Sequence, residues 1–113
     1  QIPDSHHFLY KLLSSTVARD HRTIELIARK DAEVKLAIFL LDLSKRFRAR
    51  GCSASHFSLS MKRSEIGNHL GLAVETVSRL FTRFQQDGLL QVNKRQISIL
   101  DFIKLERLAG VRA

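Results

Sequence analysis

Cysteine, proline and tryptophan are scarce in this sequence, and long hydrophobic runs are missing. The 113 residues include one Cys, one Pro and no Trp. A single cysteine, Cys52, excludes an internal disulfide framework and any zinc or iron–sulfur site built from several cysteines. No apolar run approaches the roughly 18 residues that a membrane-spanning helix needs, and no charged-then-apolar leader opens the chain. We therefore expect neither a membrane protein nor a secreted precursor, and we expect a reducing, cytoplasmic setting.

Positive charge is the most marked feature of the composition. Lys and Arg number 19 against 11 Asp and Glu, which gives a formal net charge of +8. Residues 1–29 hold four basic and three acidic side chains, so nearly all of the excess lies in residues 30–113. A small basic domain attracts polyanions, and nucleic acid is the commonest of them. RNA binders and membrane-surface proteins share this positive charge. The arrangement of residues therefore has to decide between these classes of protein.

The first 29 residues are predicted to form a dimerisation helix. Their apolar residues follow spacings of three and four in alternation, which is typical of a coiled-coil seam. The seam consists of Tyr10, Leu13, Val17, Asp20, Ile24 and Ile27. We expect a joint at residues 29–31, where Asp31 would cap a second helix.

Asp20 is the one acid in this seam. In a parallel dimer it would face its own copy, and two such charges repel. We hypothesise that this repulsion keeps the dimer weak, so that another part of the protein controls assembly. The alternative is a slightly rotated helix that leaves Asp20 in water.

The second helix is predicted to pack deeply on a core. One face carries Val34, Ile38 and Leu41, and other apolar residues broaden it to the width typical of a deeply packed helix. These are Leu36, Phe39, Leu40, Leu43 and Phe47.

The remaining sequence predicts a mainly α (α+β) fold, a winged helix-turn-helix. After a loop at residues 51–57, the patterns indicate a short strand (57–60) and two helices (61–71 and 74–87) joined by a glycine-containing turn. Two strands (89–92 and 96–99) follow with a basic tip at 93–95, and Asp101 caps a last helix. A hairpin with a basic tip after two short helices is the arrangement of a wing.

The second of the two short helices has one apolar and one polar face. Val77, Leu80, Phe81 and Phe84 are expected to point inward. The expected outward residues are Glu75, Ser78, Arg79, Thr82 and Arg83. Packing against the first helix would come from Ile66, Leu70, Leu72, Val77 and Leu80. This division leaves a polar surface free for base edges in a major groove.

The run from Ile66 to Leu80, IGNHLGLAVETVSRL, resembles the signature of the bacterial cyclic-AMP receptor and fumarate–nitrate reduction regulator (CRP/FNR) family. Its segment Val74–Arg79 is closer to the fumarate–nitrate, or anaerobic regulator, branch. The other branch usually has Arg in place of Val74 and Gly in place of Ser78. The resemblance extends over nearly the whole chain, from about Pro3 to Leu108.

This resemblance implies a dimeric transcription regulator whose N-terminal sensor is missing here. The sequence starts at Gln1 rather than Met, so we expect a C-terminal piece of a longer chain, with residues 1–29 as the end of the helix from the sensor and 30–113 as the DNA-binding domain. We expect no cofactor in this part, because an effector or iron–sulfur cluster would belong to the sensor. The loop at 51–57 resembles a contact surface for RNA polymerase, although a plain connecting loop is the simpler interpretation.

Four residues are predicted to contact bases. Arg79 would donate two hydrogen bonds to guanine, and Glu75 would accept one from a cytosine amino group. Val74 and Ser78 would face thymine methyls or neighbouring edges. Together these contacts predict a palindrome with TTGA-like half-sites. The alternative is that Glu75 and Arg79 form only a surface ion pair.

Five further residues are predicted to contact phosphate, which positions a protein on DNA without reading its sequence. They are Arg63, Ser64, Thr76, Lys94 and Arg95. The alternative for each of them is an ordinary solvated surface charge. For two other basic residues, Lys62 and Arg83, phosphate contact and a solvated charge are equally expected. No catalytic constellation or phosphate-binding loop is present, and Cys52 with His56 makes no zinc site, so we expect no enzyme and no metal. The rival functions are a protein–protein interaction module and a non-specific DNA binder.

Overall fold

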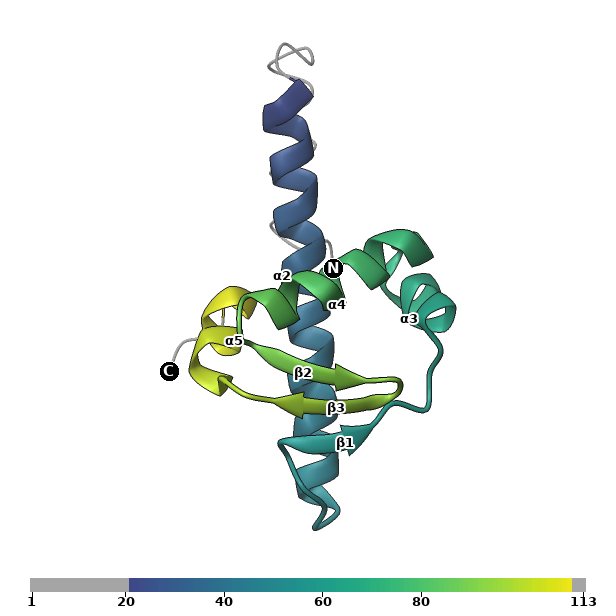
Figure 1. Cartoon of the computed structure of the whole chain (residues 1–113), viewed down its shortest axis with the longest axis vertical. Coiled ribbons are helices and arrows are strands. Elements are labelled where there is room, and N and C mark those ends of the chain that lie inside the picture. The colour runs from purple at the N-terminus through teal and green to yellow at the C-terminus, as the bar shows by residue number, and fades with distance from the viewer. Residues whose placement is uncertain (1–20, 111–113) are drawn as a thin grey trace.

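The computed structural model describes residues 21–110, which form four helices and one three-stranded sheet. In chain order the elements are α2 (His21–Ala49), β1 (His56–Ser58), α3 (Arg63–Leu70), α4 (Val74–Gln86), β2 (Leu90–Asn93), β3 (Gln96–Ile99) and α5 (Phe102–Ala109) (Figure 1). None of the described helices combines the length and apolar character that a bilayer crossing requires. This order confirms the predicted winged helix-turn-helix.

Strand β3 lies at the centre of the sheet and pairs antiparallel with both β1 and β2. β1 begins one residue earlier than predicted and ends at Ser58. The amide of Leu59 continues the antiparallel pairing one step further and donates to the carbonyl of Arg95 (2.7 Å). β2 and β3 are joined by Lys94 and Arg95, and Lys94 has a φ of 57°. Short hairpin turns use this left-handed region, which lets the chain reverse within two residues.

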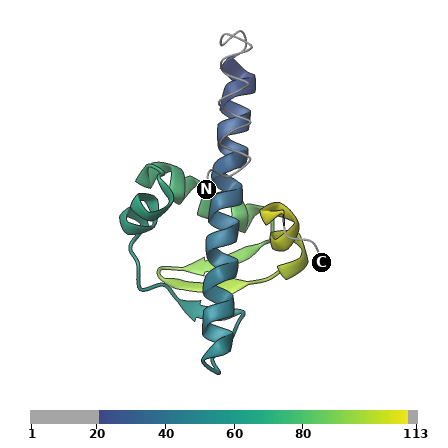
Figure 2. The same cartoon turned by 180° about the vertical axis from the view of Figure 1, so that it is seen from behind.

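Helix α2 runs through residues 29–31 without interruption, so the joint predicted there is wrong. Asp31 does not cap a helix. Its Oδ2 lies 3.5 Å from Nζ of Lys35 one turn later, a pairing that stabilises continuous helix. The N-terminal end of α2 extends beyond the other described elements (Figures 1 and 2), and Arg22, Leu26 and Arg29 line a hollow that this part of α2 shares with α4.

The buried face of α2 also differs from the predicted one. Leu36 and Leu40 are fully buried, whereas Ile38 is 49% exposed. Val34 and Leu41 are only half-buried. The residues predicted to broaden the face are therefore at its centre, because α4 and α5 contact that side of the helix and the sheet adds side chains to the same core.

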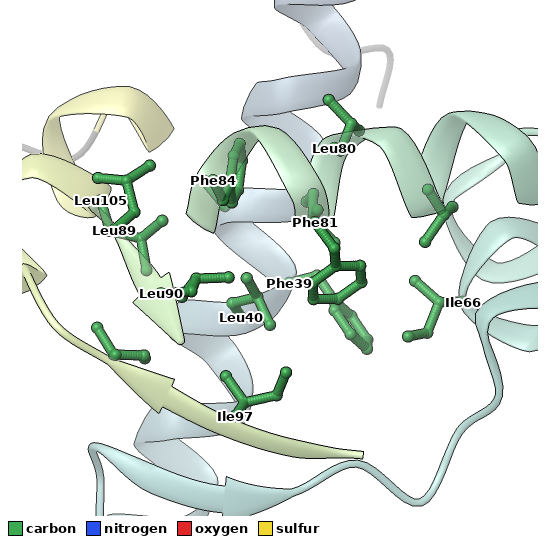
Figure 3. Close-up of a cluster of buried hydrophobic side chains, with 14 of the residues drawn as sticks. Phe39, Leu40, Ile66, Leu80, Phe81, Phe84, Leu89, Leu90, Ile97 and Leu105 are labelled. Carbon is green, nitrogen blue, oxygen red and sulfur yellow. The ribbon is translucent and has the colours of Figure 1, made fainter. Parts of the chain in front are cut away.

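One hydrophobic core joins all these elements, and Figure 3 shows much of it. Side chains from α2 (Leu40), α4 (Phe81 and Phe84) and the sheet (Leu90 and Ile97) meet at its centre. Burial of a large apolar side chain contributes about 1.5–3 kcal/mol relative to leaving it exposed. This shared core fixes the orientation of α4, whose opposite face remains in solvent.

Candidate nucleic-acid interface

The two helices of the helix-turn-helix are held together by a small buried contact. Ile66 of α3 and Val77 of α4 are fully buried, and Leu80 is nearly so. Leu70 and Leu72, also predicted to pack here, are half-buried. The contact therefore fixes α4 relative to α3.

Glycine is required at two places near the turn between these helices, inside α3 and at its C-terminal end. At Gly67, an added Cβ would lie 2.5 Å from the carbonyl oxygen of Leu72. The amide of Leu72 also donates to the Gly67 carbonyl (2.7 Å), so the backbone passes very close to α3. Gly71 ends α3 with a φ of 73°, which favours glycine. The sequence predicted the turn from Gly71 but not the close approach at Gly67, whose one local signal is a glycine inside a short helix.

Helix α4 presents the two faces that the sequence predicted. Val77, Leu80, Phe81 and Phe84 are buried. Val74 is 42% exposed, and Glu75, Ser78, Arg79, Thr82 and Arg83 are exposed as well. The spacing of Val74, Ser78 and Thr82 puts them on one side of the helix, with Glu75 and Arg79 beside them. The candidate base-contacting residues thus form one open surface on the first turns of α4.

The acidic and basic residues of this surface are not paired with each other. Within residues 21–110, ion pairs join Lys35 to Asp31, Arg46 to Asp42 and Arg83 to Glu33, and none joins Glu75 to Arg79. The simple surface ion pair considered as an alternative is therefore not observed. Both side chains have their polar atoms available for an external partner.

The wing turn lies on the same side of the molecule as α3 (Figures 1 and 2). Lys94 and Arg95 are exposed at its tip. Arg63, the first residue of α3, reaches across and donates from Nη2 to the carbonyl oxygen of Lys94 (3.1 Å). Its guanidinium also lies 4.2 Å from the ring centroid of Phe81. Positive side chains from the helix-turn-helix and the wing are thereby gathered on one side.

Burial gives Arg63 an unusual environment for a surface cation. The side chain is half-buried, and this desolvation, together with the nearby charge of Arg95, lowers the pKa of Arg63. Burial and like charge both disfavour the charged form of a basic group. An anion placed between Arg63 and Arg95 would relieve part of that repulsion.

The other two candidate phosphate contacts lie in the first turns of the two helices. Ser64 is exposed in the second position of α3, and Thr76 is half-buried in the third position of α4. The first turn of a helix has backbone amides without helical partners and the positive end of the helix dipole, and both favour phosphate. At α3, the amide of Lys62 is already used by Glu65 Oε1 (2.7 Å).

The predicted dimer seam is described only in part. Ile24 and Ile27 are half-buried on α2, and Leu26 beside them is 51% exposed. Tyr10, Leu13, Val17 and Asp20 lie outside the described residues. The described end of the seam is therefore the pair Ile24 and Ile27, three residues apart on one side of α2, whereas Leu26 faces a hollow between α2 and α4.

The predicted loop at 51–57 is shorter in the structure. His56 and Phe57 belong to β1, and Phe57 is buried, with its ring stacked 5.2 Å from that of Phe47. The exposed loop is therefore reduced to about residues 51–55. The buried hydroxyl of Ser44 donates to the carbonyl of Ala54 (2.6 Å) and anchors this loop to α2.

No metal centre emerges among the described residues. Within residues 21–110, His, Cys, Asp and Glu side chains do not gather in groups of three or more that could hold an ion. Cys52 is an exposed free thiol in the loop after α2. The candidate site that the geometry supports is the polar surface of α4, whose opposite face is buried in the core.

Comparison with known proteins identifies the family of the chain. A family model described as the Crp-like helix-turn-helix domain matches residues 34–108. The transcriptional activator protein Anr of Pseudomonas aeruginosa is 51% identical over 110 residues, which cover 97% of this chain and 45% of that protein. The fumarate and nitrate reduction regulatory protein of Vibrio cholerae is 44% identical over 111 residues, which cover 98% of this chain and 44% of that protein.

Among solved structures, DNR of Pseudomonas aeruginosa has a TM-score of 0.67 at 26% identity, covering 96% of this chain and 46% of that one. The chain thus spans a little under half the length of the curated relatives it matches. The family match covers the whole of the helix-turn-helix and the wing. The chain therefore belongs to the CRP/FNR family of transcription regulators, with close relatives among the anaerobic regulators.

Proposed function

We propose that this chain binds double-stranded DNA in a sequence-specific manner, as the DNA-binding part of a transcription regulator. The observation that carries the proposal is the division of α4, which buries Val77, Leu80 and Phe84 and leaves Glu75 and Arg79 open to solvent. A helix fixed by its inner face and polar on its outer face is suited to entering a major groove. Membership of the CRP/FNR family supports the same function.

Recognition would be carried by the first turns of α4. Arg79 is exposed and unpaired within the described chain, so its guanidinium can donate two hydrogen bonds to guanine O6 and N7. Glu75, one turn earlier, accepts from a cytosine amino group, while Val74 and Ser78 face thymine methyls or neighbouring edges. The proposed half-site resembles TTGA, in which this pair of residues reads the G·C base pair.

Contacts with the phosphates of the DNA backbone would position α4 relative to the bases. Lys94 and Arg95 of the wing are exposed, and Ser64 and Thr76 lie in the first turns of their helices. Contacts of these groups with phosphate position the domain without reading bases. Because each contact releases counterions, affinity should fall steeply with salt.

Two copies of the chain would bind a palindrome with half-sites about one helical turn apart, roughly 34 Å. Ile24 and Ile27, three residues apart on one side of the N-terminal part of α2, support pairing through this helix. In the proposed dimer Asp20 weakens the contact by repelling its copy, so Asp20→Ala should tighten self-association in sedimentation experiments. An unchanged dimer constant would remove that role for Asp20.

Effector binding and contact with RNA polymerase would not involve the DNA-binding surface. Since the chain spans under half of its relatives' length, an effector or cluster would bind in another part of the longer protein. The exposed loop of about residues 51–55, anchored by Ser44, is the proposed contact for RNA polymerase.

Selection of bound duplexes from a random pool tests the function. The proposal predicts recovery of two inverted TTGA-like half-sites with a fixed spacing. Retention of all sequences to the same degree would indicate a non-specific binder. Absence of retained duplex would indicate that the fold serves protein–protein contact. Arg79→Ala is the matched variant, since it removes the main base contact and leaves the wing unchanged.

A further inference from the structure

Arg63 makes contacts that its prediction as a phosphate ligand does not explain. Its Nη2 donates to the carbonyl of Lys94 (3.1 Å), a residue 31 positions further along the chain. Its guanidinium also lies 4.2 Å from the centroid of the Phe81 ring, and Phe81 is buried in the core. Arg63 therefore connects three parts of the proposed DNA-binding surface, namely the start of α3, the inner side of α4 and the wing turn.

The wing turn is held on its other side by the segment after β1. The Leu59 amide donates to the Arg95 carbonyl (2.7 Å), and Arg95 Nη1 is 3.5 Å from the carbonyl of Ser60. These contacts restrain Arg95, whereas the contact from Arg63 restrains Lys94, whose φ of 57° is uncommon for a residue with a side chain. The two residues of the turn are thus fixed from two different elements.

The geometry of this contact is specific to arginine. A planar guanidinium can stack over an aromatic ring and still donate hydrogen bonds from its edge, which a lysine ammonium cannot reproduce. Half-burial beside Arg95 makes the charge of Arg63 unfavourable. The cost of keeping a charged arginine in this place must be offset by its hydrogen bond and its contact with the Phe81 ring, or by a bound anion.

We propose that Arg63 is a positioning residue, which locks the wing turn against the helix-turn-helix so that Lys94 and Arg95 are presented to the DNA backbone. The inference rests on the proposed DNA binding, but its structural half concerns the free protein. It differs from a direct phosphate contact in one respect. A direct contact depends on the charge of Arg63, whereas a lock depends on the shape of its guanidinium.

Arg63→Lys separates these two roles, because it keeps the positive charge and loses the planar guanidinium. Arg63→Gln removes both, and Arg48→Gln, at an exposed position near the end of α2, is the control for loss of one charge. Amide hydrogen exchange in the free chain gives the first readout. We expect the Leu59 amide, which is bonded to the wing turn, to exchange about tenfold faster in both Arg63 variants. The Leu89 amide, bonded to Phe84 in the core, should be unchanged.

Two exchange results would overturn the proposal. Wild-type protection of Leu59 in Arg63→Lys would show that charge is sufficient. Equal acceleration of the Leu59 and Leu89 amides would show that Arg63 supports the whole fold rather than the wing.

Binding to random-sequence duplex DNA, measured over a range of salt concentrations, gives the second readout. We expect Arg63→Lys to flatten the salt dependence by about one unit of slope or more, although its net charge is unchanged, because the wing contacts are lost. An unchanged slope in this variant would overturn the proposal. If the wild-type chain itself does not bind duplex, the proposed function fails, while hydrogen exchange still decides whether Arg63 locks the wing.

Discussion

The guanidinium of Arg83 on α4 lies 3.2 Å from the carboxylate of Glu33 on α2. The Glu33 side chain is only 12% exposed and that of Arg83 is 44% exposed, so the pair lies at the edge of the core. It connects the helix proposed to read DNA with the helix proposed to carry the dimer contact. Arg83 was expected on the outward face of α4, and the structure shows that this position also reaches α2.

Glu33→Gln should lower the free energy of unfolding by about 0.5–1 kcal/mol, because a partly exposed ion pair contributes little more than that. The loss should shrink at high salt, which screens the pair. Urea denaturation at low and high salt measures both effects. In an Arg83→Gln background the same substitution should cost almost nothing. Equal costs in the two backgrounds would show that the pair does not contribute.

Arg79→Ala should reduce discrimination at the G·C pair of the half-site by about 1–3 kcal/mol, since a bidentate contact to guanine is lost. Competition between duplexes that differ only at this base pair measures the effect. The fold should be unaffected, because Arg79 is exposed and makes no ion pair within the described chain. Equal weakening of binding to every duplex would instead show that Arg79 contacts the phosphates of the DNA backbone.

Helix α4 was predictable because its signals are local. Its faces follow from a helical period within its own thirteen residues, and Gly88 follows its C-cap residue, Asp87. The wing was predictable for the same reason, since two short apolar strands flank a polar tip. The contact between Arg63 and Lys94 joins residues 31 positions apart, and no local pattern specifies it. The candidate site could thus be located from sequence, but not the contact between Arg63 and the wing turn.

Helix α2 shows where local reasoning fails. The charged residues at 29–31 resemble a boundary, yet charges alone do not break a helix, and α2 continues to Ala49 before Gly51 (φ 78°). The buried side of α2 was misjudged because several faces are apolar. Which of them is covered depends on α4, α5 and the sheet, which come later in the sequence.

Leu40→Ala and Ile38→Ala test the revised orientation of α2. Leu40 is fully buried, so its truncation should destabilise the fold by about 2–5 kcal/mol through lost burial and a cavity. Ile38 is 49% exposed, and its truncation should cost well under about 1 kcal/mol. Chemical denaturation of both variants gives the comparison. A larger loss for Ile38→Ala would restore the face that the sequence first predicted.

Gly67→Ala should disturb the helix-turn-helix itself. The added Cβ would lie 2.5 Å from the Leu72 carbonyl, so the turn must shift, at a cost of about 1–3 kcal/mol. Gly71→Ala is the matched control, because its Cβ meets no atom within 4 Å and only its φ of 73° is unfavourable. Denaturation measures stability, and duplex binding measures the shift of α4. We expect Gly67→Ala to weaken binding more than Gly71→Ala, and the reverse order would contradict a close-packed turn.

Lys94→Asn isolates the charge of the wing from its conformation. Asparagine tolerates the left-handed region better than most residues, so the turn at φ 57° should be kept while one positive charge is removed. If Lys94 contacts phosphate, the salt dependence of duplex binding should flatten by about one unit of slope, with the preferred sequence unchanged. Arg48→Gln removes a charge at the end of α2 and should leave the slope unaltered. The same slope for Lys94→Asn and the wild-type chain would mean that the wing does not contact the DNA backbone through Lys94, and Arg95 would then be the residue to test.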